Sequence, residues 1–288
     1  MKWKTFALTC FSFAAAASGV QTAAHAAEPV SIVVNDRTVV TDAPPFIQNG
    51  TTYVPLRSIE QIEGLSITSW NNKTKTLVVA GPGQSSTFRV SNPAAAGSPI
   101  IQNNRVMVPI RFIATNFSSD VIWNRYTQTV YVAKVDEKTK ASLKSSNLTE
   151  ARAAALNVPK ISALKEFVST ESSAGSLQIY FPEGGSDSFF MIENGIIDYY
   201  EVKSNAALLV WSGKIGGQQN KLSFLADTGI SSEVGRRPKV NERLFFYKIS
   251  THAGQSQYGY VDTDGKETVL GSRELNSLDD LYPIQEEN

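Results

Sequence analysis

The sequence predicts an α+β protein in which a repeated domain is followed by a β-rich antiparallel barrel or sandwich domain. Two observations predict this class. The first half contains an internal repeat whose unit reads as strands, a short helix and a hairpin. The second half, from residue 176 onward, is a series of short β-rich segments separated by turn residues.

The N-terminal segment precedes both domains and has the pattern of an export signal. Lys2 and Lys4 are followed by an apolar stretch, and Ala24-His25-Ala26 matches the small-x-small pattern before a signal peptidase cut. The apolar stretch is short for a membrane span, which needs about 20 residues, and Cys10 lies inside that stretch rather than at a lipoprotein cleavage site. We therefore expect residues 1–26 to be a signal peptide and the product to be secreted, with no transmembrane segment after cleavage.

The repeat occupies the next hundred residues. IQNGTTYVPLRSI at 47–59 aligns with IQNNRVMVPIRFI at 101–113, and WNNKTKTLVV at 70–79 aligns with WNRYTQTVYV at 123–132. Each unit is predicted to begin with a tight turn and a strand that ends at a proline, Pro55 or Pro109. A short helix follows, then a strand ending in Trp70 or Trp123, a polar turn and a β-branched strand.

These paired motifs resemble the copper amine oxidase N-terminal domain family, also called stalk domains, over roughly residues 30–133. The resemblance rests on Tyr-Val-Pro-Leu-Arg at 53–57 and Trp-Asn at 70–71, with their counterparts at 108–111 and 123–124. It implies an accessory module of secreted proteins of Gram-positive bacteria rather than an oxidase. In copper amine oxidases the copper and the quinone belong to a separate catalytic domain, so the resemblance implies no metal and no cofactor here.

Arg57 and Arg111 take the same place in both units, each after a proline at a helix start. One interpretation is a contact with an anion or a polysaccharide. The interpretation that we favour is a buried guanidinium that ties helix to sheet. We likewise expect Trp70 and Trp123 to pack over the helices. Pro55, Arg57, Trp70, Pro109, Arg111 and Trp123 are thus predicted to be structural residues of the repeat.

The predicted domains are residues 27–135 for the repeated domain, 136–175 for a linker with marginal helices, and 176–288 for the β-rich domain. In the last, Asn194-Gly195 and Thr263-Asp264-Gly265 are hairpin signals. Asp262 to Gly265 also resembles the start of a calcium loop, but the later ligand positions do not fit. Strands are predicted at 177–181, 189–193, 196–202, 206–211, 222–225, 243–250, 258–262 and 267–270.

The β-rich domain carries two candidate sets of functional residues. Aromatic residues crowd into it, and an exposed aromatic platform could bind sugar rings or a protein partner, whereas burial on both faces of the sheet is the alternative. The candidate ligand residues are Tyr199, Tyr200, Trp211, Tyr258 and Tyr260. The second set is a possible carboxylate pair for glycoside hydrolysis among Glu183, Asp187, Glu193 and Asp198.

The net charge and the numbers of cysteine and histidine residues argue against several classes of function. The 27 basic and 27 acidic residues cancel, which gives no electrostatic reason to expect nucleic acid as a partner. One cysteine and two histidines argue against disulfides, zinc sites and most cysteine or histidine catalysis. We expect a secreted, non-catalytic binding or scaffolding protein of the cell envelope, whose partner is a cell-wall polysaccharide or another envelope protein. The alternatives are an extracellular carboxylate-dependent hydrolase and a secreted inhibitor or regulator.

Overall fold

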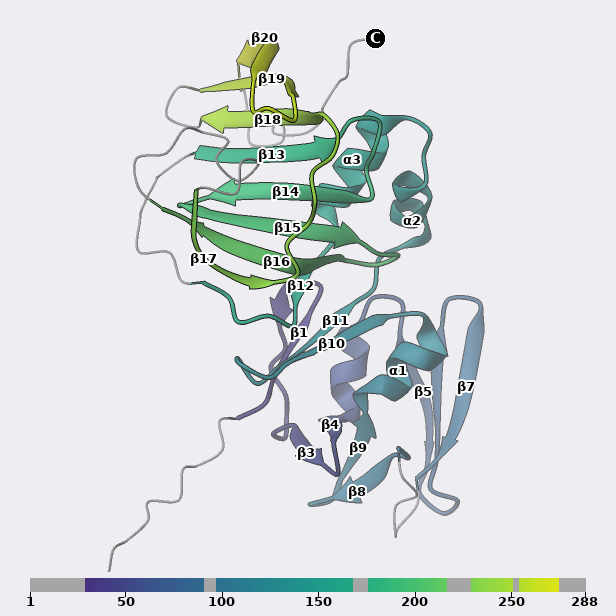
Figure 1. Ribbon diagram of the computed structural model, residues 1–288. Coiled ribbons are helices and arrows are strands. Elements are labelled where there is room, and N and C mark those ends of the chain that lie inside the picture. The colour runs from purple at the N-terminus through teal and green to yellow at the C-terminus, as the bar shows by residue number, and fades with distance from the viewer. Residues whose placement is uncertain (1–28, 91–96, 168–175, 217–228, 251–253, 275–288) are drawn as a thin grey trace, which may run out of the picture.

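The computed structural model describes residues 29–90, 97–167, 176–216, 229–250 and 254–274. The predicted signal peptide lies outside these ranges, as do the strand predicted at 222–225 and His252. Two bodies stack on one another, with the repeated domain below and the β-rich domain above in the view of Figure 1. The α+β class is confirmed. No helix in the described part of the chain is long and apolar enough to cross a bilayer.

Three small sheets build the repeated domain. Their strand orders are β10-β11-β1-β2, β3-β4-β9-β8 and β5-β6-β7. The elements are β1 (Ser31–Val34), β2 (Arg37–Thr38), β3 (Phe46–Gln48), β4 (Thr51–Pro55), the 3₁₀ helix η1 (Leu56–Gln61), β5 (Ser66–Asn71), β6 (Thr76–Gly81), β7 (Gln84–Arg89), β8 (Ile100–Gln102), β9 (Arg105–Pro109), α1 (Ile110–Phe117), β10 (Asp120–Asn124) and β11 (Thr129–Ala133).

The two repeats pair with each other about a local two-fold axis. Strands β4 and β9 are antiparallel, and Val54 lies directly opposite Val108, its counterpart in the other repeat. The flanking strands β3 and β8 complete a symmetric sheet. The symmetry ends at the outer sheets, because β6 pairs with β7 whereas its counterpart β11 pairs with β1 in parallel. The first strand of the chain thus closes the second repeat.

The repeated turn motif has a direct physical basis. The carboxamide oxygen of each repeated asparagine, Asn71 or Asn124, accepts hydrogen bonds from the two backbone N–H groups that lie two and three residues onward. The side chain thus replaces part of a backbone turn. Five residues after each asparagine, a threonine hydroxyl donates to the carbonyl of the threonine two residues before it. This network explains why the pattern Asn-x-x-Thr-x-Thr occurs in both units.

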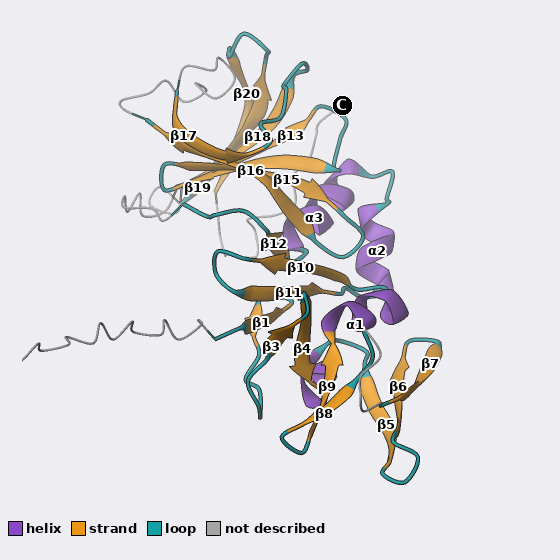
Figure 2. Cartoon of the chain, turned by 60° about the horizontal axis from the view of Figure 1, so that its bottom comes forward, coloured by secondary structure: helices purple, strands orange, loops and turns teal. Residues whose placement is uncertain are grey.

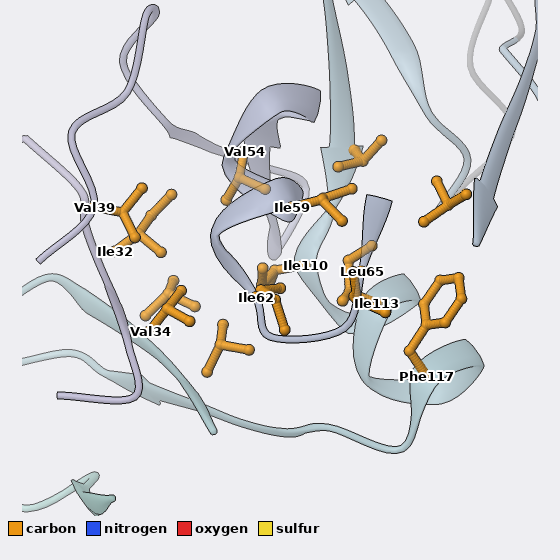
Figure 3. Packing of buried hydrophobic residues seen from close by; sticks show 14 of the residues in the cluster. Ile32, Val34, Val39, Val54, Ile59, Ile62, Leu65, Ile110, Ile113 and Phe117 are labelled. Atoms are coloured by element: carbon orange, nitrogen blue, oxygen red, sulfur yellow. The ribbon is translucent and has the colours of Figure 1, made fainter. Parts of the chain in front are cut away.

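Helices η1 and α1 cover the repeated domain's core. Ile59, Ile113 and Phe117 are almost completely buried, and Figure 3 shows the side chains of β1, η1 and α1 turned toward one another. Helix α1 ends at Phe117, and its C-cap is Ser118, whose φ of 52° is left-handed. The 3₁₀ helix η1 ends with Ile62 as its C-cap, and Gly64, with φ of 72°, lies in the turn that follows.

The β-rich domain is one open sheet of nine strands rather than two packed sheets in the described residues. Its order is β12-β16-β15-β14-β13-β18-β19-β20, with β17 paired to β16, and Figure 2 shows that it curves strongly. The strands are β12 (Lys160–Ser162), β13 (Ser176–Pro182), β14 (Ser188–Glu193), β15 (Ile196–Val202), β16 (Ala207–Ile215), β17 (Ile230–Gly235), β18 (Leu244–Ser250), β19 (Gln255–Val261) and β20 (Glu267–Glu274).

The segment predicted to be a linker is integrated into the β-rich domain. It holds α2 (Glu137–Leu143) and α3 (Leu148–Asn157), which start at Asp136 and Asn147 with side-chain caps. Ala155 and Leu156 of α3 pack on one face of the sheet, and β12 pairs in parallel with β16. Strand β12 was not expected, because three residues are too few to show the alternation of a strand.

Hydrogen bonds lock the two domains together. Asn205, in the turn before β16, is 3% exposed and donates from Nδ2 to the Ser118 carbonyl and the Asp120 carboxylate at 3.0 and 3.3 Å. Its Oδ1 accepts from the Val135 N–H. Asn124 of the repeated domain donates from Nδ2 to the Leu164 carbonyl on the other side of the junction at 3.0 Å. A small apolar cluster that includes Ala133, Ile161 and Ala206 spans the same junction.

Candidate functional site

A pocket of about 380 Å³ lies where the β-rich sheet meets the repeated domain. We call it the junction pocket. Most of its lining comes from residues 160–167 of the linker segment and from strands β14, β15 and β16, and one residue, Tyr131, comes from β11 of the repeated domain. Its polar lining residues are Tyr131, Lys160, Ser162, Glu166, Glu193, Asn194, Asp198, Tyr200 and Ser212.

Strand register explains why a carboxylate lies at its base. Asp198 of β15 is opposite Met191 of β14 on one side and Ser212 of β16 on the other. Glu193 lies two residues after Met191 and therefore shares the same face of the sheet. The alternation of the strands thus brings Asp198, Glu193 and Ser212 to one surface, the face that α3 also covers farther along.

The carboxyl of Asp198 is held by two hydroxyl groups. Ser212 and Tyr200 both hydrogen-bond to it. Burial raises the pKa of Asp198, the two hydrogen bonds oppose that effect, and the nearby Glu166 and Glu193 reinforce it. Burial and the charge of Asp198 also raise the pKa of the Tyr200 hydroxyl. Asp198 at the base of the pocket therefore stays protonated to a higher pH than a solvated aspartate does.

The opposite wall is built on Lys160. Its ammonium donates to the Leu156 carbonyl at the end of α3 at 2.8 Å, and burial lowers its pKa while Asp36 opposes that shift. Asp36 belongs to the β1–β2 turn, with φ of 61°, and its carboxylate accepts the backbone N–H of Lys160. The repeated domain thus touches the wall of the junction pocket through Asp36 and Tyr131.

The chemistry available in the pocket is hydrogen bonding beside apolar surface. A half-buried carboxyl, four hydroxyl groups and an amide lie next to Phe167, Met191 and Leu209. Such a mixture of oriented polar groups and apolar walls is typical of sites for small organic molecules or sugar residues. The volume suffices for one or two sugar rings.

The five aromatic residues predicted to bind a ligand do not form one platform. Tyr200 lines the junction pocket. Tyr199 and Trp211 lie on the other face of the sheet, where Trp211 is 1% exposed and donates from Nε1 to Glu233. Tyr258 and Tyr260 share the face of Tyr200 but stack around Phe245 on β18. Successive side chains of a strand point to opposite faces of the sheet, so the five aromatic residues are divided between its two faces.

The four candidate carboxylates divide in the same way. Glu193 and Asp198 meet in the junction pocket. Glu183 instead forms a surface ion pair with Arg243, and Asp187 lines a different cavity beside Asp120 and Asn205.

The predicted hairpin at Thr263-Asp264-Gly265 is confirmed, with Gly265 at φ of 83° and its N–H bonded to the Asp262 carbonyl.

The expectation that Arg57 and Arg111 are buried ties is wrong. Both are exposed, and the side chain of Arg57 is 80% exposed, 3.9 Å from Asp42. Leu56 and Ile59 face the core three residues apart, so the residue after Leu56 points away from it. Trp123 packs against the core as expected, whereas Trp70 is 37% exposed and lines a surface hollow with Arg57. Pro55 and Pro109 end β4 and β9 as predicted.

The described residues contain no histidine and no cysteine. Imidazole and thiolate are the groups that copper prefers, and both histidines and the cysteine fall outside the residues that the structure describes. Within those residues, no three histidine, cysteine, aspartate or glutamate side chains come together to hold a metal. The described donor set therefore does not fit a copper site.

Comparison with known families identifies only the first domain. The family model described as "Copper amine oxidase N-terminal domain" matches residues 33–97 and again residues 91–165. The two matched segments correspond to the two repeats, and the second extends through α3 and β12. No curated protein and no solved structure matches the chain.

Proposed function

We propose that the chain is an exported, non-catalytic binding protein of the bacterial cell envelope, because residues 33–97 and 91–165 match the model of the copper amine oxidase N-terminal domain family in two adjacent copies. In this proposal the repeated domain is an accessory module, and the junction pocket receives the ligand, a segment of cell-wall polysaccharide. The signal-like residues 1–26 support export.

One observation carries the proposal. The junction pocket takes its walls from both domains, with Asp198 and Tyr200 on the sheet and Tyr131 on β11 of the accessory module. The hydrogen bonds that Asn205 and Asn124 form across the junction keep these walls in fixed relation. A ligand in the pocket would contact both domains, and a preformed site loses little entropy on binding.

The test is sedimentation of the purified protein with cell-wall sacculi. We expect the wild type to sediment with sacculi, and Asp198→Asn and Tyr131→Ala to weaken that binding. Asp264→Asn is the matched control, because Asp264 is an exposed turn residue far along the chain in the β19–β20 hairpin. A wild type that stays in solution, or pocket variants that sediment as well as the control, would contradict the proposal.

Export has its own test. Mass spectrometry of protein secreted by the native host should find a chain that begins at Ala27 or within a residue or two of it. An intact Met1 on a soluble intracellular pool would rule out the assigned location.

A second candidate function is hydrolysis of a glycan in the same pocket. The observation that favours it is the pairing of Asp198, whose pKa is raised by burial, with Glu193 and Glu166 in one cavity. Glycoside hydrolysis uses one carboxylic acid that stays protonated and one carboxylate. In this reading Asp198 is the proton donor to the leaving oxygen.

Release of reducing ends from sacculi separates the two functions. A hydrolase would release soluble fragments in the wild type and none in Asp198→Asn, while Asp264→Asn would retain full activity. Binding without any release of reducing ends would favour the non-catalytic function.

A further inference from the structure

We propose that the surface hollow at Trp70, on the repeated domain, is a binding site for an acidic sugar, a pyranose ring that carries a carboxylate or a phosphate group. The hollow encloses about 360 Å³ and is separate from the junction pocket, with which it shares no residue. The proposal stands even if the junction pocket binds nothing.

Both repeats contribute to the hollow. The first repeat supplies Arg57 from η1 and Trp70 from β5, and the second supplies Arg105 at the start of β9. The apolar side chains Leu56, Ile67 and Val106 form the remaining walls with Pro55, Asn104 and Asp42. The pairing of β4 with β9 brings these segments together, so the site requires the two-fold arrangement of the repeats.

The charged groups leave guanidinium donors available for a ligand. Asp42 Oδ2 accepts from Nε of Arg105 at 3.1 Å, which orients that guanidinium. Arg57 lies farther from Asp42, at 3.9 Å, with its side chain 80% exposed, so the exchange of that weak contact for a ligand has a small cost. Two arginines against one aspartate give the hollow a positive charge, and a guanidinium can bind carboxylate or phosphate through two parallel hydrogen bonds.

Trp70 supplies the surface for the sugar ring. It is one of the few large apolar side chains in the described residues with more than a third of its surface exposed, at 37%. An exposed indole beside apolar walls can cover the C–H face of a pyranose, while the arginines pair with the anionic substituent. An aromatic surface next to arginine donors therefore selects a ligand that has both a ring and a negative charge.

The counterpart position in the second repeat lacks this combination. Arg111 and Trp123 correspond to Arg57 and Trp70, but Thr51 stands where the first site has Arg105. Trp123 packs against the core, and the neighbouring Asn124 donates from Nδ2 to Leu164 of the adjoining segment at 3.0 Å. Arg111 is thus an exposed arginine at the matching position of the second repeat but without the second arginine, which makes it a matched control.

The experiment is calorimetric titration of the purified protein with an oligogalacturonate, with wall teichoic acid and with a neutral cello-oligosaccharide. We expect the wild type to bind at least one acidic ligand, with affinity that falls as salt rises from about 50 to about 500 mM. Oligogalacturonate binding would identify the anion as a carboxylate, and teichoic acid binding would identify it as a phosphate. The neutral ligand should bind at least about tenfold more weakly, because it leaves the arginines unpaired.

The variants decide whether binding occurs at the hollow. Trp70→Ala, Arg57→Ala and Arg105→Ala should each weaken binding by about tenfold or more, whereas Arg111→Ala and Asp264→Asn should leave it unchanged. Melting temperatures control for folding, and the highly exposed Arg57 provides a variant that should fold normally. Absence of binding to both acidic ligands, equal binding of the neutral ligand, or equal losses in Arg57→Ala and Arg111→Ala would overturn the proposal.

Discussion

Arg152 is the arginine that this protein buries. It lies on α3 with no exposed surface, donates from Nε to the Gly185 carbonyl and from Nη2 to the Pro182 carbonyl, and stacks about 5 Å from the rings of Phe181 and Phe245. The buried guanidinium that ties a helix to a sheet, predicted for Arg57, is thus that of Arg152 in the predicted linker. An alanine-rich helix with a weak apolar stripe gives no sequence signal for a buried charge.

Replacement of Arg152 by alanine should therefore destabilise the β-rich domain by about 3 kcal/mol or more, because it removes the hydrogen bonds to two carbonyls and leaves a cavity between two rings. Arg57→Ala should change stability by less than about 0.5 kcal/mol, as expected of an exposed residue. Urea unfolding of both variants measures the difference. Equal stabilities would mean that the Arg152 contacts contribute nothing.

Asp198 should give stability an unusual dependence on pH. Burial raises its pKa in the folded protein, so the folded state binds more protons than the unfolded state above pH about 4. Stability should therefore fall as pH rises through the folded pKa. Asp198→Asn keeps an acceptor for Ser212 and Tyr200 and removes the buried charge, so its melting temperature should exceed that of the wild type at pH 8 and match it near pH 4.

A greater gain for Asp198→Asn at pH 4 than at pH 8 would contradict this assignment. Asp264→Asn serves again as the control, because Asp264 is exposed and should show no difference between the two pH values.

At the scale of elements, the repeated asparagine turns were the best sequence signal, and they differ in burial. Asn124 is fully buried and has an additional hydrogen bond to Leu164, whereas Asn71 is exposed. Asn124→Ala should lower the free energy of unfolding by about 2–3 kcal/mol and Asn71→Ala by about 1 kcal/mol, since only the first substitution leaves buried groups unpaired. Chemical unfolding of the two variants gives the comparison, and a larger loss for Asn71→Ala would reverse it.

Local signals located most strands but not their partners. The strand at 196–202 was predicted with its observed bounds, because Asn194-Gly195 marks the turn before it. Strand β17 was missed, since Ile-Ser-Ser-Glu-Val-Gly is polar and short. The junction pocket could be predicted only in part, because Glu193 and Asp198 were candidates but Ser212, Lys160 and Tyr131 reach it through long-range pairing.

At the scale of the whole molecule, the junction makes one unit of two domains. Asn205 joins the turn before β16 to Ser118, Asp120 and Val135, and its sequence context gives no indication of this role. Asn205→Ala should lower stability by about 2–3 kcal/mol and split a single calorimetric transition into two. Ser204→Ala, at the neighbouring exposed position, is the control. A single transition at an unchanged temperature in Asn205→Ala would show that the junction does not couple the domains.

The placement of Val54 opposite Val108 relates this chain of two units to a dimer of single units. A polypeptide with only one such unit would expose β4 as an unpaired edge whose best partner is the same edge of a second molecule. The pairing of equivalent residues is the geometry of an isologous homodimer. The present domain thus has the geometry of such a dimer with its two halves joined in one chain, and the halves differ at matching positions such as Thr51 and Arg105.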